Sequence, residues 1–100
     1  MASLSVDVPH QLPKEEALTR IKKLLGNLKQ EQKEYISNVQ ENWVGNKGNF
    51  SFTVKGFDCS GTIIVNDTNV DIDSKVPFAV SLFKGKITSM IKEKARELLA

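Results

Sequence analysis

The sequence has few of the residues on which metal centres and nucleophilic sites depend. It carries one cysteine, Cys59, and one histidine, His10, and the two lie far apart along the chain. A single cysteine cannot form an intrachain disulfide, and a zinc site needs three or four protein ligands brought together. These counts exclude a disulfide framework and argue against a zinc centre, so we expect no metal and no cofactor.

Long apolar runs and a strong charge of one sign are also missing. No stretch approaches the roughly 18–20 apolar residues that span a bilayer, and the first residues lack the basic and apolar segments of a signal peptide. The net charge is only +2, whereas proteins that neutralise phosphates usually cluster basic residues on one face. We therefore expect a cytoplasmic protein with no transmembrane segment and no nucleic-acid partner.

What the sequence does contain is typical of a small globular protein. Of its 100 residues, 40% are hydrophobic and 26% charged, with three prolines and six glycines. This apolar content is enough to offset the entropy of ordering the chain. The length matches one domain with one core, so residues 1–100 are expected to form a single domain.

Alternation of polar and apolar residues predicts strands. Residues 3–8 form a short first strand that ends at Pro9. Four more strands follow between about residues 36 and 73, and the short turns between them favour an antiparallel meander with one face in water. The turns are expected at residues 45–48, 56–58 and 66–69.

Two segments show the periodicity of amphipathic helices. The first opens near Pro13 and is expected to end near residues 30–34. The second is a long helix from Pro77 to the C-terminus, where Gly85 marks a kink or a join with a short leading turn. The apolar stripe of the first helix consists of Ala17, Ile21, Leu24, Leu25 and Leu28.

These elements predict an α+β fold in two layers. A twisted antiparallel sheet packs on helices in the order β-α-β-β-β-β-α, with a long C-terminal helix. The apolar face of the sheet and the apolar stripes of the helices can be buried by packing against each other.

Cys59 and His10 are the candidates for nucleophilic or acid–base chemistry. Cys59 lies at the start of an alternating strand, where a small buried side chain packs well. His10 lies between the first strand and the first helix, and we expect it to hydrogen-bond a backbone group there. It remains the one polar position that could serve as a ligand or acid–base site.

Other patterns have ordinary structural explanations. Asp67, Asp71 and Asp73 do not follow the spacing of a calcium loop and are expected to face water. Phe50 and Phe52 lie in a strand beside lysines, as in sheets that stack bases, but their face must cover the helices. Residues 84–97 carry five basic and two acidic side chains, which is typical of a solvated helix face.

The uncharged segment over residues 76–83 has two interpretations. It can be the buried start of the last helix, which we favour because eight residues at helical spacing fill a core easily. It can instead be an apolar surface with a basic rim at Lys84 and Lys86, suited to a membrane or another apolar surface. The contacts of that surface would be Phe78, Val80, Leu82 and Phe83.

The order and spacing of several motifs resemble the bacterial family of polyhydroxyalkanoic acid system proteins. The resemblance covers about residues 5–99 and departs from the family pattern at residues 30–36 and 46–48. The family's link to polyester storage implies an association and no defined reaction. The residues that carry the resemblance are His10, Leu12, Glu16, Ala17, Arg20, Ile21, Trp43, Phe50, Phe52, Gly61, Val65 and the run from Phe83 to Ile87.

The resemblance implies a non-enzymatic accessory or binding protein whose partner is a polyester granule or a granule-associated protein. One alternative is a carrier of small apolar ligands, with a cavity between the curved sheet and the C-terminal helix. An enzyme that uses His10 or Cys59 is a second alternative, and a homodimer joined through sheet edges is a third.

Overall fold

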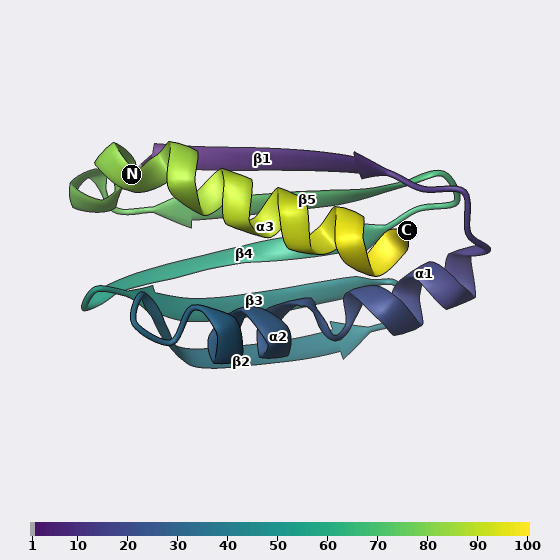
Figure 1. Ribbon diagram of the computed structural model, residues 1–100, viewed down its shortest axis with the longest axis horizontal. Helices are drawn as coiled ribbons and strands as arrows, with labels where there is room; N and C mark the ends of the chain where they lie inside the picture. Colours follow the sequence, from purple (N-terminus) through teal and green to yellow (C-terminus); the bar gives the residue numbers. More distant parts are fainter. Residues whose placement is uncertain (1) are drawn as a thin grey trace.

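The computed structural model describes the backbone of residues 2–100 and the side chains of residues 3–79 and 82–100. The chain runs in the order β-α-α-β-β-β-β-η-α (Figure 1). The strands are β1 (Ala2–Pro9), β2 (Ile36–Val44), β3 (Lys47–Val54), β4 (Phe57–Val65) and β5 (Asn69–Val76). The helical elements are α1 (Lys14–Ile21), α2 (Leu24–Glu31), the 3-10 helix η1 (Phe78–Phe83) and α3 (Lys84–Leu99).

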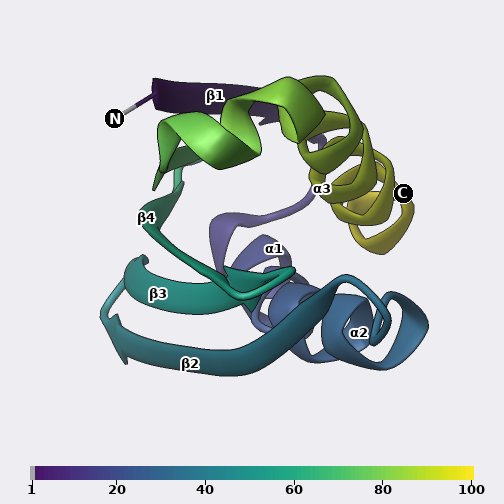
Figure 2. The ribbon, with the colours of Figure 1, turned by 90° about the vertical axis from the view of Figure 1, so that its left-hand side faces the viewer.

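All five strands form one antiparallel sheet in the order β1-β5-β4-β3-β2. The four strands from β2 to β5 are a meander, and β1 pairs with the free edge of β5, where Val6 lies opposite Ile72. Figure 2 shows the sheet curling around the helices, which all lie on its inner side. The predicted α+β class and element order are confirmed.

The core lies between the inner face of the sheet and the helices. Leu4, Val6 and Val8 are buried, whereas Ser3 and Ser5 are exposed. The same alternation continues across the sheet, because residues that pair across antiparallel strands share a face. One face is therefore packed and the other wet, as the sequence predicts.

The first helical segment differs from the prediction of a single helix. It is broken at Lys22 and Lys23, which form a turn between α1 and α2. Gly26, the residue most expected to interrupt a helix, lies inside α2. The two short helices keep the apolar stripe continuous, and all of its members are buried: Ala17, Ile21, Leu24, Leu25 and Leu28.

The turn between β3 and β4 consists of Lys55 and Gly56, one residue earlier than predicted. Both have positive φ, +50° and +87°, as in the two-residue turns whose twist matches antiparallel strands. Glycine adopts this conformation without steric cost. Phe57 consequently opens β4 rather than lying in the turn.

The C-terminal segment is a short apolar helix, η1, followed by α3. Ile87, Ile91, Ala95 and Leu99 are the buried apolar residues of α3, and α3 packs against β1, α1 and α2. Within the described part of the chain, no helix is long and apolar enough to cross a membrane.

Lys94 is a charged residue of α3 that is itself buried. Its Nζ lies 2.6 Å from Glu31 of α2 and 3.4 Å from Glu97. The hydrogen bond to Glu31 is the main cause that raises the pKa of Lys94 above its ordinary value. This ion pair fixes α3 to the end of α2.

Candidate functional site

The largest exposed apolar side chains of the last segment lie in η1. Phe78 is 72% exposed, Leu82 88% and Phe83 43%; we call these three residues the η1 tip. Val80 was predicted to belong with them, but its side chain lies outside the described residues. The η1 tip is therefore the best candidate for contact with an apolar partner.

The favoured interpretation of this segment as buried core is wrong for these three residues. Val76, the last residue of β5, is fully buried, and the core of α3 begins only at Ile87. Between them the chain winds as a 3-10 helix, with three residues per turn instead of 3.6. The apolar spacing that would line one face of an α-helix therefore does not produce a buried stripe here.

Two lysines pack on aromatic rings at the base of the η1 tip. The Nζ of Lys55 lies 5.1 Å from the ring centres of both Tyr35 and Phe83, and the Nζ of Lys86 lies 3.8 Å from the centre of the Tyr35 ring. Each cation–π contact of this kind contributes about 0.5–1 kcal/mol at an exposed site. We call these four residues the lysine–tyrosine cluster, and it joins η1 to the β3–β4 turn.

The lysine–tyrosine cluster also changes the acidity of Tyr35. The hydrogen bond and the charge of Lys86, with a smaller effect from Lys55, lower the pKa of the phenol below its ordinary value of 10.0. A small hollow of about 180 Å³ opens between Tyr35, Lys55 and Phe83. This end of the molecule is therefore positively charged around exposed aromatic surface.

Phe57 adds a further exposed ring at the same end of the molecule. It is 43% exposed and follows the β3–β4 turn, which lies at the η1 end in Figure 1. Lys84, at the start of α3, is exposed beside the η1 tip. Apolar residues with lysines around them suit a partner that offers both alkyl surface and acceptor oxygens.

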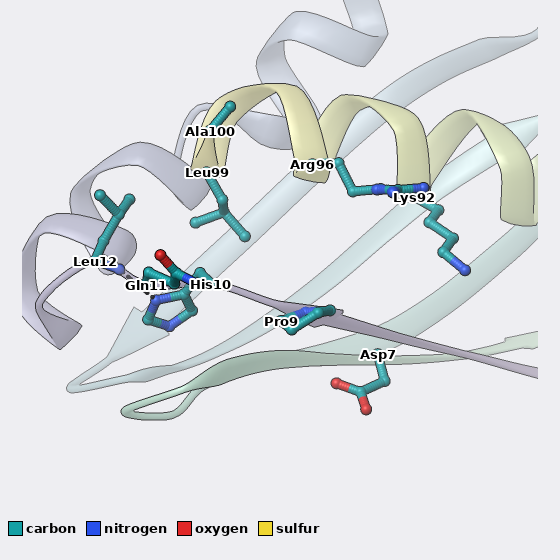
Figure 3. Close-up of a pocket in the computed structure, with 9 residues that line it drawn as sticks. All are labelled: Asp7, Pro9, His10, Gln11, Leu12, Lys92, Arg96, Leu99 and Ala100. Carbon is teal, nitrogen blue, oxygen red and sulfur yellow. Dashed lines mark hydrogen bonds between the residues drawn. The ribbon is translucent and has the colours of Figure 1, made fainter.

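His10 lies at the opposite end of the molecule and ties two loops together. It is 8% exposed, and its Nδ1 accepts a 3.1 Å hydrogen bond from the Leu12 N–H (Figure 3). Nε2 therefore carries the proton and donates to the Asn66 carbonyl at 3.0 Å. The expected hydrogen bond to a backbone group is confirmed. Both ring nitrogens are occupied, so His10 has neither one available for a ligand.

Cys59 is buried on the inner face of β4, opposite Phe52. Burial raises the pKa of the thiol, and the charge of Asp58 adds to the effect. A catalytic cysteine needs a lowered pKa and some exposure. Cys59 also lies six residues along β4 from Val65, about 20 Å, while His10 lies near that far end; the two are not a catalytic pair.

Two of the three acidic residues near the β4–β5 turn are held by hydrogen bonds. Asp71 accepts from Asn66 and Asn69, and Asp73 accepts from Ser5 at 2.6 Å. Asp67 is exposed in the turn. Over the described residues, no three His, Cys, Asp or Glu side chains gather closely enough to hold a metal ion.

The interior between the sheet and the helices is filled. The cavity bounded by Phe52, Ile87 and neighbouring apolar residues measures about 10 Å³, which is close to the space of one water molecule. Pockets for small ligands measure roughly 300–1,000 Å³. Phe50 and Phe52 help to fill this interior, stacked with ring centres 5.8 Å apart and each 4% exposed, so they present no base-stacking surface.

The sequence indicated the residues of the η1 tip but not the lysine–tyrosine cluster. Tyr35, Lys55 and Lys86 come from the α2–β2 connection, the β3–β4 turn and α3. These three residues are far apart in the sequence and form no recognisable motif. Only the pairing of the strands and the packing of α3 bring them together.

Residues 4–99 match the family described as "Putative polyhydroxyalkanoic acid system protein". No curated protein matches the chain. Among solved structures, the crystal structure of TTHA0849 from Thermus thermophilus is similar, with 15% sequence identity and a TM-score of 0.46 over 98% of this chain and 92% of that chain. That degree of similarity gives no information about what this chain binds.

Proposed function

This chain belongs to the polyhydroxyalkanoic acid system protein family, and we propose that it is a non-enzymatic accessory protein that binds the polyester surface of storage granules through the η1 tip. A cytoplasmic location is part of the proposal. The observation that carries it is the exposure of Phe78, Leu82 and Phe83 within six residues of one another.

The exposed side chains of the η1 tip would contribute part of the free energy of attachment. Removing one large apolar side chain from water contributes about 1.5–3 kcal/mol. Burying Phe78 and Leu82 together would thus contribute about 3–6 kcal/mol before the costs of association. A partner with a continuous apolar surface is needed to cover both side chains at once.

The lysines around the η1 tip complement the polar part of a polyester. Ester carbonyls accept hydrogen bonds, and polymer chain ends are carboxylates, which attract ammonium groups. Lys84 is exposed at the tip, and Lys55 and Lys86 lie behind it against aromatic rings. Apolar residues would meet the alkyl side groups while lysines meet the ester oxygens.

Three observations support binding over the alternatives. The cavity of about 10 Å³ in the core is too small for a ligand enclosed between the sheet and the helices. His10 has both ring nitrogens in hydrogen bonds to backbone groups. Cys59 is buried with a raised pKa. These features favour a structural role for the residues that an enzyme would have used.

The proposal is tested by co-sedimentation of the purified protein with amorphous polyhydroxybutyrate particles. The double variant Phe78→Ser/Leu82→Ser should bind at least about tenfold more weakly, since it loses the apolar contact of both side chains. Val44→Ser is the matched control: Val44 is 71% exposed but ends β2, at the other end of the molecule (Figure 1).

The control should bind as the unchanged protein does, and both variants should keep its thermal stability. Equal binding by the unchanged protein and the double variant would refute the η1 tip as the contact surface. Failure of the unchanged protein to sediment, together with retention by a granule-coating protein, would refute direct polyester binding and favour a protein partner.

A further inference from the structure

A second opening lies at the end of the molecule opposite the η1 tip, between β1, the β1–α1 connection and the last turns of α3 (Figure 3). Its volume is about 750 Å³, within the range of small-ligand sites. We call it the basic pocket. It is lined by Asp7, Pro9, His10, Gln11, Leu12, Lys92, Arg96, Leu99 and Ala100.

Two cations enter the basic pocket from the same face of α3. Lys92 and Arg96 are four residues apart, so their side chains lie one above the other on the helix, and Figure 3 shows them side by side. The ion pairs found among the described residues involve Arg20 and Lys94, and neither Lys92 nor Arg96 takes part in one. Two adjacent like charges repel each other, and a bound anion would relieve that repulsion.

The acidic group of the basic pocket limits how much negative charge it accepts. The Asp7 carboxylate lines the pocket and accepts a 2.8 Å hydrogen bond from Asn69. Ala100 also lines the pocket, and its carbonyl oxygen accepts a 2.7 Å hydrogen bond from Arg20 of α1. The side chains of Lys92, Arg96 and Asp7 together carry a net charge of about +1, which matches a monoanion better than a dianionic phosphate.

The remaining walls of the basic pocket are partly apolar. Leu99 is buried at 6% exposure, Leu12 is half-buried, and Pro9 is exposed at the rim. His10 closes one side, with its ring nitrogens already bonded. A ligand that places a charged group at Lys92 and Arg96 would therefore lay an alkyl chain along Leu12 and Leu99.

From this arrangement we infer that the basic pocket binds a small amphipathic carboxylate, with the carboxylate on Arg96 and Lys92 and a short alkyl chain on the leucines. Arg is suited to this task because its planar guanidinium can donate two parallel hydrogen bonds to one carboxylate. Free hydroxyalkanoic acids are members of this class, and that identification alone rests on the proposed function. The protein would then contact the polymer at one end and its soluble acid at the other.

The test is a titration of the isotope-labelled protein, followed by NMR, with octanoate, octanol and inorganic phosphate in turn. Octanoate should shift the amide signals of residues 10–12 and 92–99. Octanol lacks the charge and phosphate lacks the alkyl chain, so each should bind at least about tenfold more weakly. Equal binding of octanol, or equal binding of phosphate, would overturn the inference.

The variant Lys92→Gln/Arg96→Gln should reduce octanoate affinity at least about tenfold, as expected for the loss of charged hydrogen bonds. The matched control is Lys29→Gln/Lys33→Gln, which removes the same charge from two exposed lysines with the same spacing. The control should bind octanoate as the unchanged protein does. An equal loss in both variants would mean that net charge alone attracts the acid, and would refute the site.

This experiment is independent of the polyester assay. The basic-pocket variant should still sediment with polyester, and the η1-tip variant should still bind octanoate. If octanoate binding fails while sedimentation succeeds, the inference falls and the proposed function stands. If sedimentation fails while octanoate binds, only the proposed function falls, together with the assignment of the ligand to hydroxyalkanoic acids.

Discussion

The two ends of the molecule differ in the side chains that they present and in how those side chains are bonded. At the η1 end, Phe78, Leu82 and Phe83 expose apolar surface to solvent. At the far end, Asn66 and Asn69 bond to Asp71, Asn69 also reaches Asp7, and His10 bonds to backbone groups of two loops. The amide, acidic and histidine side chains at the far end are held by hydrogen bonds within the chain, whereas the η1 end exposes apolar surface to solvent.

This difference separates stability from binding. Buried polar groups are costly unless they are paired, so the far end should be sensitive to substitution without affecting attachment. Exposed apolar side chains contribute little to folding, so Phe78 and Leu82 should be replaceable without loss of stability. Substitution and chemical modification at the two ends test this separation, from the largest expected effect to the smallest.

Replacing His10 should cause the largest loss of stability. His10→Ala leaves the Leu12 N–H and the Asn66 carbonyl without their partner, and should lower the free energy of unfolding by about 2–4 kcal/mol. Urea denaturation measures the change. Gln11→Ala, at the exposed neighbouring position, should change it by less than about 0.5 kcal/mol.

Polyester binding by folded His10→Ala should be unchanged. If His10→Ala lost polyester binding but kept its stability, the His10 end would serve binding rather than stability, which would contradict the proposed roles of the two ends.

Cys59 should be protected although it lies in β4 near the η1 end. Alkylation of the native protein should be more than about a hundredfold slower than that of the protein in urea, because the thiol is buried and its thiolate is disfavoured. The pKa of Cys59 in the folded protein is raised from the ordinary 9.0, so the folded protein holds the thiol proton more tightly than the unfolded chain does. The stability that this difference contributes is complete below pH 9.0 and is lost as pH rises through the folded pKa. Rapid native alkylation would show that the η1 end is loosely packed.

Tyr35 should show a smaller effect of the opposite sign. The pKa of Tyr35 in the folded protein is lower than the ordinary 10.0, so folding favours the ionised phenol. The stability that this contributes is complete above pH 10.0 and is lost as pH falls through the folded pKa. Lys86→Met should raise the pKa of Tyr35 towards its ordinary value. The chain has one tyrosine, so tyrosinate absorbance during a pH titration reports it directly.

The matched control for this change is Lys84→Met, which removes an exposed neighbouring charge and should move the pKa much less. Equal shifts in the two variants would mean that the cluster geometry has no specific effect on the phenol.

Much of the fold could be predicted from periodicity. Alternation located the strands because each has one buried face, as Leu4, Val6 and Val8 illustrate. The break between α1 and α2 was missed because Lys22 and Lys23 lie between stripe residues and leave the apolar spacing in phase. A two-residue turn on the exposed side leaves no trace in the hydrophobic pattern.

The candidate site was less predictable. The segment over residues 76–83 has apolar residues at helical spacing, and spacing alone does not distinguish a buried α-helix from an exposed 3-10 helix. The lysine–tyrosine cluster and the basic pocket are assembled by tertiary contacts between distant segments. His10 was the exception, because a polar residue between a strand and a helix has few partners other than backbone groups.

The central claim is that the η1 end contacts the polyester and the far end does not. Hydrogen–deuterium exchange of the unmodified protein, with and without polyester particles, tests it most directly. The account predicts slower exchange in peptides covering η1, the start of α3 and the β3–β4 turn, and unchanged exchange in the β2–β3 and β4–β5 turns. Slower exchange at those far turns, or no change at η1 while the protein is bound, would contradict it.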